Sequence, residues 1–273
     1  FIGDGGTGDS TQKLIGNALY HLDQGISLEG VVLLGDNFVR WDGEGGPAQA
    51  CKEFFEEPYA PLLENGMPFY AVLGNHDIDH GMMDYCINYP RFNMKGKRFY
   101  SKMFGNKIVE VFFLDSNTIQ NDALQVEWLK EALKQSEALW KVVAMHHPLH
   151  STTRKPCDAS KTQILEPLFV EYGVNLVLSG HNHVYERLYP IHGVEYMTVG
   201  SGGKLEEGAL LPESPKRIAG NDRENVTVVL RFSRHSCSFA AYTLNEKIVD
   251  EGEISNKNPP HAKRITPRSP LSA

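Results

Sequence analysis

The chain has 273 residues, a length that suits one large domain or two small ones. Its 41% hydrophobic and 22% charged residues are close to globular averages and exclude the disordered, collagen-like and coiled-coil classes. The 27 Lys and Arg residues against 34 Asp and Glu residues give a net charge of −7, which argues against nonspecific binding to nucleic acid or anionic lipid.

The apolar pattern in the first part of the chain alternates short runs with amphipathic stretches, which predicts strands interleaved with helices. In chain order, the pattern predicts a helix over residues 11–22, a strand over 31–34, a helix over 47–55, strands over 69–73 and 107–114, a helix over 123–135, a strand over 141–145, a helix over 162–172 and a strand over 176–179. Asp122 and Ser160 are the expected N-caps of the last two helices.

From residue 194 onward the pattern changes to strands joined by turns, predicted over residues 194–199, 226–232, 238–243 and 248–254. The last residues carry four prolines and several basic side chains without an apolar period, which indicates a loosely packed tail. We therefore expect one domain over residues 1–254 and a Pro-rich basic tail over 255–273. No apolar run approaches the roughly 18 residues needed to span a bilayer.

Four widely spaced cysteines occur at Cys51, Cys86, Cys157 and Cys237. They form no C-x-x-C pair, which argues against thiolate zinc sites and thioredoxin-like redox chemistry. Two disulfides and four unpaired thiols are both open at this point, because a cysteine count does not fix the cellular compartment.

The first residues, Phe1 to Asp4, have the pattern of a strand that runs into a loop, so we expect further residues upstream. A signal peptide can therefore be neither seen nor excluded. Asn225-Val226-Thr227 is a glycosylation sequon, a triplet that is common by chance. We expect an exported protein, of secreted, periplasmic or vacuolar/lysosomal type, rather than a cytoplasmic one.

Side chains that can bind metal ions directly follow five apolar runs. The five segments are Gly3-Asp4-Gly5-Gly6, Gly35-Asp36-Asn37, Gly74-Asn75-His76-Asp77, His146-His147-Pro148 and Gly180-His181-Asn182-His183. In open α/β sheets, ligands gather outside the carboxyl ends of the strands, so these loops are expected to converge on one site.

The donor types indicate what such a site binds. Two carboxylates, one carboxamide and three imidazoles, without cysteine, suit zinc, manganese or iron better than calcium or copper. Six ligands exceed the needs of one tetrahedral ion. Two ions about 3.5–4 Å apart, bridged by a carboxylate, would use them all, and such pairs serve in-line displacement at phosphorus.

These five segments, in this order, resemble the five sequence blocks of the calcineurin-like metallophosphoesterases. Further segments are similar to the purple acid phosphatase branch of that family: Gly35-Asp36-Asn37-Phe38, Gln125-Val126-Glu127-Trp128-Leu129, Tyr185-Glu186-Arg187 and Gly200-Ser201-Gly202-Gly203. The five blocks span residues 3–203, about three quarters of the chain.

The resemblance implies a role for each ligand position. The first metal would be held by Asp4, Asp36 and His183. The second would share Asp36 and would also be held by Asn75, His146 and His181.

Two neighbours in the third block have implied roles as well. His76 would stay free of the metals as the catalytic acid near the leaving group, and Asp77 could orient its imidazole. Asn75 and His76 are also candidates for contacting the substrate.

One position departs from the branch. Purple acid phosphatases carry a tyrosine three residues after the bridging aspartate, whose phenolate binds ferric iron and gives the colour, whereas this chain has Val39. Valine cannot bind a metal, so we expect a colourless protein, with two divalent ions as one option.

Several residues have alternative interpretations. His146 and His147 are adjacent and point to different sides of an extended segment, so one is expected to bind metal. The family block aligns with His146 and leaves His147 structural, and the reverse assignment is open. His150 is a candidate for binding phosphate, with a packed or exposed histidine as the alternative. Residues 185–187 are expected to support the His181 loop, with Arg187 as a structural ion-pair partner.

The resemblance implies an α/β fold, a four-layer α/β/β/α sandwich of two mixed sheets flanked by helices. It implies an acid phosphatase-like enzyme that hydrolyses phosphate monoesters by attack of metal-bound hydroxide, with two ions of iron, zinc or manganese as cofactors. The alternatives are a phosphodiesterase or nucleotide hydrolase on the same metals and a non-catalytic binding scaffold. The expected partner is a small-molecule phosphate ester, without nucleic acid.

Overall fold

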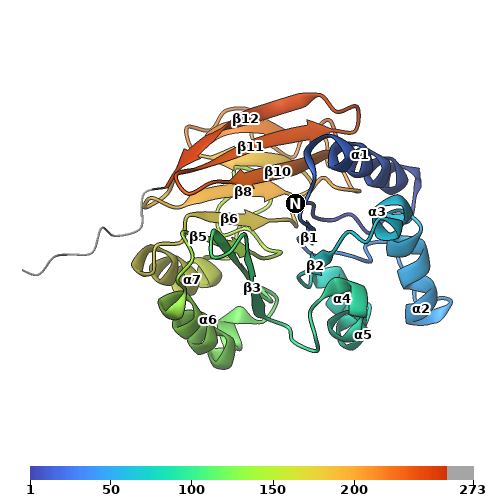
Figure 1. The fold of residues 1–273 in the computed structure, drawn as a ribbon, viewed down its shortest axis with the longest axis horizontal. Coiled ribbons are helices and arrows are strands. Elements are labelled where there is room, and N and C mark those ends of the chain that lie inside the picture. The colour runs from blue at the N-terminus through green and yellow to red at the C-terminus, as the bar shows by residue number, and fades with distance from the viewer. Residues whose placement is uncertain (257–273) are drawn as a thin grey trace, which may run out of the picture.

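Two β-sheets pack face to face, and helices cover their outer faces, so the layers follow the order helix, sheet, sheet, helix (Figure 1). The structure is a computed structural model that describes residues 1–256. This arrangement confirms the predicted four-layer sandwich. Within the described range, the helices are too short or too polar to cross a membrane.

The larger sheet has seven strands in the order β3-β4-β5-β6-β8-β7-β9. In chain order they are β3 (Tyr100–Phe104), β4 (Val109–Phe113), β5 (Trp140–Ala144), β6 (Leu176–Ser179), β7 (Tyr185–Leu188), β8 (Glu195–Val199) and β9 (Arg217–Asn221). Strands β4, β5, β6 and β8 are parallel, whereas β3, β7 and β9 pair antiparallel with their neighbours. The parallel strands bring their carboxyl ends to one edge of the sheet.

The second sheet combines the parallel pair β1 (Val31–Leu33) and β2 (Phe69–Ala71) with the antiparallel strands β10 (Val226–Phe232), β11 (Ser236–Thr243) and β12 (Ile248–Ser255). The first two residues of the chain join the two groups. Ile2 pairs with Leu33 of β1. The backbone nitrogen of Phe1 donates to the carbonyl oxygen of Val228 at 2.8 Å, and the Val228 amide donates to the carbonyl oxygen of Phe1 at 3.0 Å. The sheet is therefore continuous through the start of the chain.

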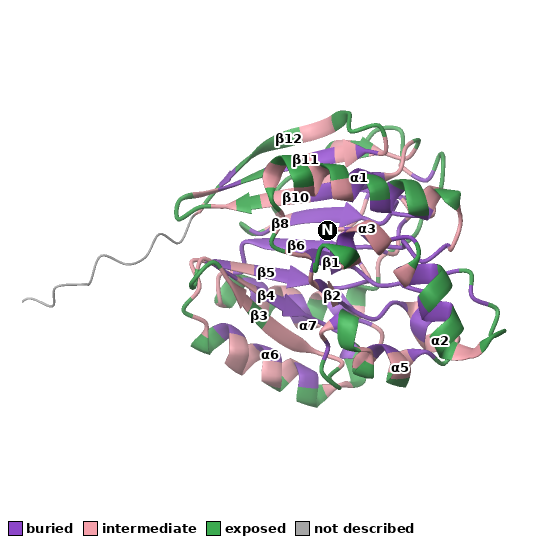
Figure 2. Ribbon diagram, turned by 45° about the vertical axis from the view of Figure 1, so that its right-hand side comes forward, coloured by how far each residue is buried: buried purple, intermediate pink, exposed green. Residues whose placement is uncertain are grey.

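Alternate residues of each strand face different hydrophobic cores, because successive side chains of a strand point to opposite faces. In β1, Val32 faces the larger sheet and Leu33 faces helices. In β4, Val111 faces the second sheet and Phe112 faces the helices on the other side. Figure 2 shows the buried strands between helices whose outer faces are exposed.

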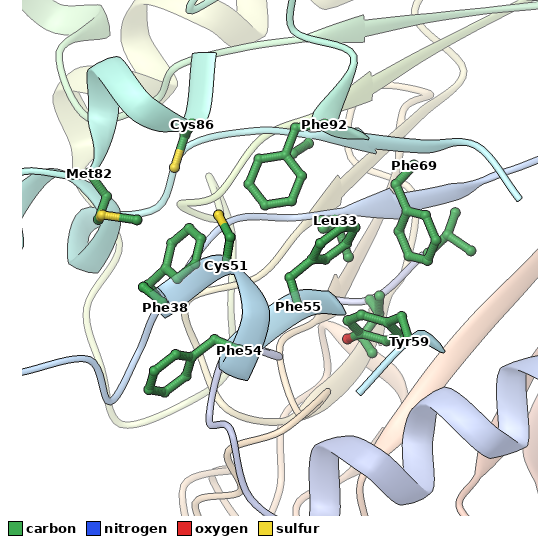
Figure 3. Close-up of a cluster of buried hydrophobic side chains, with 14 of the residues drawn as sticks. Leu33, Phe38, Cys51, Phe54, Phe55, Tyr59, Phe69, Met82, Cys86 and Phe92 are labelled. Carbon is green, nitrogen blue, oxygen red and sulfur yellow. The ribbon is translucent and has the colours of Figure 1, made fainter. Parts of the chain in front are cut away.

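Five helices lie on the β1–β2 side: α1 (Ser10–Ile26), α2 (Gly46–Cys51), α3 (Ala60–Glu64), α4 (Asn75–Asp79) and α5 (Met83–Asn88). They enclose an aromatic core in which the ring of Phe55 lies 5.0 Å from that of Phe69 and 4.9 Å from that of Phe92 (Figure 3). Helices α6 (Ala123–Gln135) and α7 (Ala159–Glu171) cover the seven-stranded sheet.

Most predicted elements are confirmed within a few residues, including α6 with its cap, where the Asp122 carboxylate accepts a hydrogen bond from the Gln125 amide at 3.0 Å. The prediction that Ser160 is the N-cap of the next helix is wrong. The carboxylate of Asp158 accepts from the Ser160 amide at 2.9 Å, so α7 begins at Ala159. The helix predicted over 47–55 continues past α2 as a π-helix, Lys52–Glu56.

The sequence pattern missed strands β3, β7 and β9. Each has residues of intermediate burial and lacks a continuous apolar run, so its sequence cannot be distinguished from that of a loop by apolar pattern. All four cysteines are unpaired in the structure. The predicted tail, apart from its first two residues, lies outside the described residues.

Candidate metal centre

The predicted ligands approach one another from both sheets. Asp4 and Asp36 follow the two central segments of the second sheet, and Asn75 starts α4 just after β2. His146 follows β5, and His181 follows β6, at the carboxyl edge of the seven-stranded sheet. The site therefore forms where the edges of the two sheets meet.

One group of ligands surrounds the side chain of Asn75. Its Oδ1 atom lies 3.1 Å from Nε2 of His146 and 3.0 Å from Nδ1 of His181. These two imidazole nitrogens are 3.2 Å apart, and Nε2 of His146 is also 3.3 Å from Oδ1 of Asp36.

A second group adjoins the first. The ligand atoms of Asp4, Asp36 and His183 lie within 4.8 Å of one another, with Oδ1 of Asp4 3.4 Å from Nε2 of His183. Asp36 contacts both groups, as expected for a bridging carboxylate. The structure thus brings all six predicted ligands together.

The deepest part of the site needs positive charge. Asp4 and Asp36 are almost fully buried, and Oδ1 of Asp4 accepts no hydrogen bond of regular geometry, although Nε2 of His183 lies 3.4 Å away. Burial raises the pKa of Asp4. Burial also acts against the charged form of Asp36, but the charge of His146 outweighs it and holds the pKa of Asp36 below its usual value. A divalent cation beside these oxygens would satisfy both groups, so the donor set fits a metal.

The neighbouring histidines respond to the same carboxylates. Burial lowers the pKa of His146, yet the charges of Asp36 and Asp4 outweigh it and raise the pKa to about 9. Burial and the charge of His146 lower the pKa of His181 to about 2. The carboxylates of Asp4 and Asp36 therefore favour a protonated His146. A metal ion bound beside them would supply this positive charge instead.

The ligand loops have an unusual backbone. Asp4, Asp36 and His181 have φ values of 56°, 54° and 67°, in the left-handed region that non-glycine residues rarely adopt. Such conformations cost of the order of 1–3 kcal/mol each and are typical of functional sites. A Cβ atom on Gly74 would lie 2.1 Å from Oδ1 of Asp36, so only glycine allows this approach of the two loops.

A backbone contact decides which nitrogen of His146 faces the site. Its Nδ1 atom lies 2.9 Å from the carbonyl oxygen of Leu34, which can only accept, so Nδ1 carries the hydrogen and Nε2 is free for a metal. His147 lies beside the site, with Nδ1 2.9 Å from the hydroxyl of Ser116 and its ring 4.4 Å from the ring of His181. The ligand atoms of His146, His147 and His181 lie within 4.8 Å of one another, so His147 stays an alternative, and His146 is supported by its contacts with Asn75 and Asp36.

Asp77 does not contact the His76 ring, contrary to the prediction. Its carboxylate accepts from the Gly74 amide at 2.8 Å and from the amides of Asn37 and Phe38 at 2.9 and 3.1 Å. Asp77 thus joins the loop of Asp36 to the loop of Asn75. Burial, followed by the charge of Asp36, raises its pKa to about 7.

His76 is partly accessible and more exposed than His146, His150 and His183. Its side chain is 32% exposed, and Nε2 lies 3.9 Å from Oδ2 of Asp36. Its amide donates to Oδ1 of Asp36 at 2.9 Å, which fixes the first turn of α4 over the bridging carboxylate. This position leaves the ring at the rim of the site.

His150 points toward α7. Its Nε2 atom lies 2.6 Å from Oε1 of Glu166, and its ring packs edge-on against Tyr196. The contacts of His150 therefore give no support to the predicted phosphate-binding role. Val39 is buried and offers no ligand atom.

Residues behind the ligand loops were only partly anticipated. Arg187 forms a two-bond ion pair with Asp250 at 2.6 and 2.9 Å, as expected for a structural partner. The Asp115-Ser116-Asn117 turn after β4 was missed, although Asn117 donates to the carbonyl of Leu73 at 3.2 Å. The sequence could have indicated this turn, because it also directly follows an apolar strand, β4, at the carboxyl edge of the seven-stranded sheet.

The sequence model of the calcineurin-like phosphoesterases matches residues 9–185. The chain belongs to this metal-dependent family of phosphoesterases. Within the family it lies in the purple acid phosphatase-like branch, as its relatives show.

One relative is tartrate-resistant acid phosphatase type 5 of Oryctolagus cuniculus, 27% identical over 64% of this chain and 62% of that protein. Another is purple acid phosphatase 17 of Arabidopsis thaliana, 26% identical over 77% of this chain and 70% of that protein. The chain therefore spans less than two thirds of the rabbit protein. A similar solved structure is that of GAP50, the anchor in the inner membrane complex of Plasmodium. The superposition covers 94% of this chain and 87% of GAP50, with a TM-score of 0.80 and 19% sequence identity. This likeness shows the fold alone.

Proposed function

We propose that the protein is a phosphatase that uses two metal ions to hydrolyse phosphate monoesters. The observation that carries this proposal is the position of Asp36, whose carboxylate contacts both ligand groups next to the buried Oδ1 atom of Asp4. The relatives are phosphatases, which supports the same class of reaction.

The first ion would be held by Asp4, Asp36 and His183, and the second by Asp36 together with Asn75, His146 and His181. When bound, the pair supplies positive charge to the phosphate oxygens and activates the attacking water. Iron, zinc and manganese all suit this donor set. The ester would approach from the side where the His76 side chain is 32% exposed.

His76 would deliver a proton to the departing oxygen. Its ring is partly accessible while its backbone is fixed to Asp36, so Nε2 has a defined position above the bridging carboxylate. General acid catalysis of this kind contributes typically about 10²–10⁴-fold.

The decisive experiment loads the purified protein with zinc, manganese or iron, measures the metal content and assays aryl phosphate mono- and diesters. The proposal expects two metal ions per chain and faster hydrolysis of the monoester. His181→Ala should lose one ion and the activity together, whereas His192→Ala, which changes an exposed histidine in the turn between β7 and β8, should lose neither. Faster diester hydrolysis would replace the monoesterase by the phosphodiesterase alternative.

A binding scaffold is the second candidate, because the solved structure with a TM-score of 0.80 is described as an anchor. The presence of all six ligands and of His76 favours the enzyme. A protein with two bound ions and no hydrolysis of any ester in a broad panel would support the scaffold instead.

The cellular location belongs to the proposal as well. We expect export from the cytoplasm and a small-molecule phosphate ester as partner. Secretion of the full-length protein into the medium or into a membrane-enclosed compartment, detected by fractionation, would support this expectation, and a purely cytoplasmic protein would contradict it.

A further inference from the structure

His80 packs against the ring of His76, the side chain proposed as the general acid. The centroids of the two imidazole rings are 5.4 Å apart, and the ring planes are tilted by 45°. The residues are four positions apart, a spacing that places side chains on the same face of a helix. The His80 amide also donates to the carbonyl oxygen of His76 at 3.0 Å, as the cap of α4. The end of this short helix therefore holds a second imidazole beside the first.

The contact of His76 with Asp36 does not fix the orientation of the His76 ring. Nε2 of His76 lies 3.9 Å from Oδ2 of Asp36, which is too long for a hydrogen bond. The side chain is 32% exposed, and exposed side chains change rotamer within nanoseconds unless neighbouring atoms prevent it. Packing against the ring of His80 is a contact that can restrict this motion.

The ring of His80 is itself fixed. Its Nδ1 atom lies 3.0 Å from the carbonyl oxygen of Phe38. Because a carbonyl oxygen can only accept, Nδ1 carries the hydrogen and donates it. The buried ring of Trp41 packs edge-on against His80, with 6.3 Å between the centroids, and its indole N–H donates to the carbonyl oxygen of Glu44 at 2.8 Å. One hydrogen bond and one anchored ring therefore set the plane of the His80 ring.

These contacts belong to a wider connection between α4 and the loop that follows β1. The His76 amide donates to Oδ1 of Asp36 at 2.9 Å, and the Asp77 carboxylate accepts from the Phe38 amide at 3.1 Å. Phe38 thus uses both of its backbone polar groups on the segment from Asp77 to His80. The backbone bonds fix α4 relative to the bridging carboxylate, and the His80 ring extends this order to a side chain.

Such order matters for proton transfer. A general acid acts only within hydrogen-bond distance of the oxygen that departs. A displacement of about 1 Å in a reacting group can cost about 10²-fold in rate. A ring that rotates freely at the rim of the site would occupy the productive orientation for only part of the time.

We propose that His80 is a positioning residue, whose ring holds the imidazole of His76 in the orientation that proton delivery to the leaving group requires. This inference rests on the proposed function, because it takes His76 as the general acid. It assigns a role to a histidine that lies outside the five sequence segments of the metal centre.

The test measures hydrolysis of one aryl phosphate and one alkyl phosphate by the metal-loaded protein. An aryl leaving group departs with little help from an acid, whereas an alkyl leaving group needs the proton. His80→Ala should keep both ions and lose at least about tenfold in kcat on the alkyl phosphate, with less than about threefold loss on the aryl phosphate. KM should stay within about twofold for both esters, because the ring of His80 acts after binding.

Two replacements separate the ring from its hydrogen bond. His80→Phe keeps a ring at this position and should recover most of the activity on the alkyl phosphate. His80→Asn keeps a donor for the carbonyl oxygen of Phe38 but loses most of the ring, and should behave as His80→Ala. Asp79→Asn, which changes an exposed residue of the same helix, is the matched control and should behave as wild type. Circular dichroism and metal content check that each variant is folded.

A double variant tests whether His80 acts through His76. His76→Ala with His80→Ala should be no slower on the alkyl phosphate than His76→Ala alone, because the effects of two residues that act through one group do not add. A general loss of stability would instead lower the activity further.

The outcomes distinguish the inference from the proposed function. An unchanged ratio of alkyl to aryl kcat in His80→Ala, additive losses in the double variant, or recovery by His80→Asn but not by His80→Phe overturns the positioning role and leaves the phosphatase intact. Wild-type protein that binds two ions and hydrolyses neither ester overturns the proposed function, and the inference with it.

Discussion

Oδ1 of Asp36 lies 3.3 Å from Nε2 of His146, although the two residues follow strands of different sheets. Asp36 follows β1 of the second sheet, and His146 follows β5 of the seven-stranded sheet. The candidate metal centre therefore spans the interface between the sheets, and the proposed ion binding would connect the two sheets.

Asp36→Asn should lose metal and activity together. The amide has the same shape, so the fold is retained, but it removes the negative charge that both ligand groups share. Because loss of groups that only support ligands already costs about 10–100-fold, we expect more than about 100-fold here. Elemental analysis and an aryl phosphate assay measure the effect. Asp84→Asn, an exposed residue of α5, is the matched control.

His76→Ala should keep both ions and lose turnover. The ring contacts Asp36 only at 3.9 Å and is not among the six grouped ligands. Removal of a general acid costs typically about 10²–10⁴-fold, and the loss should be greatest for alkyl phosphates, whose leaving groups are poor. Full activity of this variant on alkyl phosphates would exclude the acid role.

Metal removal should destabilise the protein. Without cations, the buried carboxylates Asp4 and Asp36 lose their main compensation. A ligand present at about 1,000 times its dissociation constant stabilises by roughly 4 kcal/mol, which corresponds to a change in Tm of roughly 10 °C for a chain of this size. Calorimetry before and after chelation measures the difference, and re-addition of metal should restore the higher Tm. An identical Tm in both states would argue against ions at this site.

The cap of α6 should give a pH-dependent contribution to stability. Burial acts against the charged form of Asp122, but its hydrogen bond from Gln125 and the charge of Arg98 outweigh this and lower its pKa. Because the pKa of Asp122 is lower in the folded chain than in the unfolded chain, where it is about 4, the charged side chain stabilises the fold above that pH. This contribution is lost as the pH falls through the lower pKa of the folded chain.

Asp122→Ala should therefore reduce the free energy of unfolding by about 1 kcal/mol at pH 7, the typical effect of losing an N-cap. The difference from wild type should shrink at pH 3. Urea unfolding of the metal-free protein at both pH values measures it, and a constant difference would show that the charge of Asp122 is unimportant.

The metal-loaded protein should be colourless. Val39 is buried three residues after Asp36 and has no atom that can bind iron. An absorption spectrum of the iron-loaded protein should therefore lack an intense visible charge-transfer band. Such a band would show that another phenolate reaches the site.

We also expect a pH optimum nearer neutrality than that of the purple enzymes, and a sharply acidic optimum would instead indicate a trivalent ion.

Much of the fold was visible in the apolar pattern. The strands around β1, β2, β5 and β6 are short apolar runs buried on both faces, which is why their positions were predicted within a few residues. Strands β7 and β9 were missed because their burial depends on partners that are distant in the chain. The register of such strands is a property of the sheet, not of their own sequence.

The sequence by itself determined the ligand types, their order and their positions at strand ends, because a ligand must carry a donor atom and must follow a strand to reach the edge of the sheet. Only the tertiary structure decided the directions of individual side chains. Asp77 turned away from His76 toward two loop amides, and His150 turned toward Glu166. The physical reason is that a polar side chain takes its direction from the hydrogen-bond partners around it, and folding alone brings those partners together.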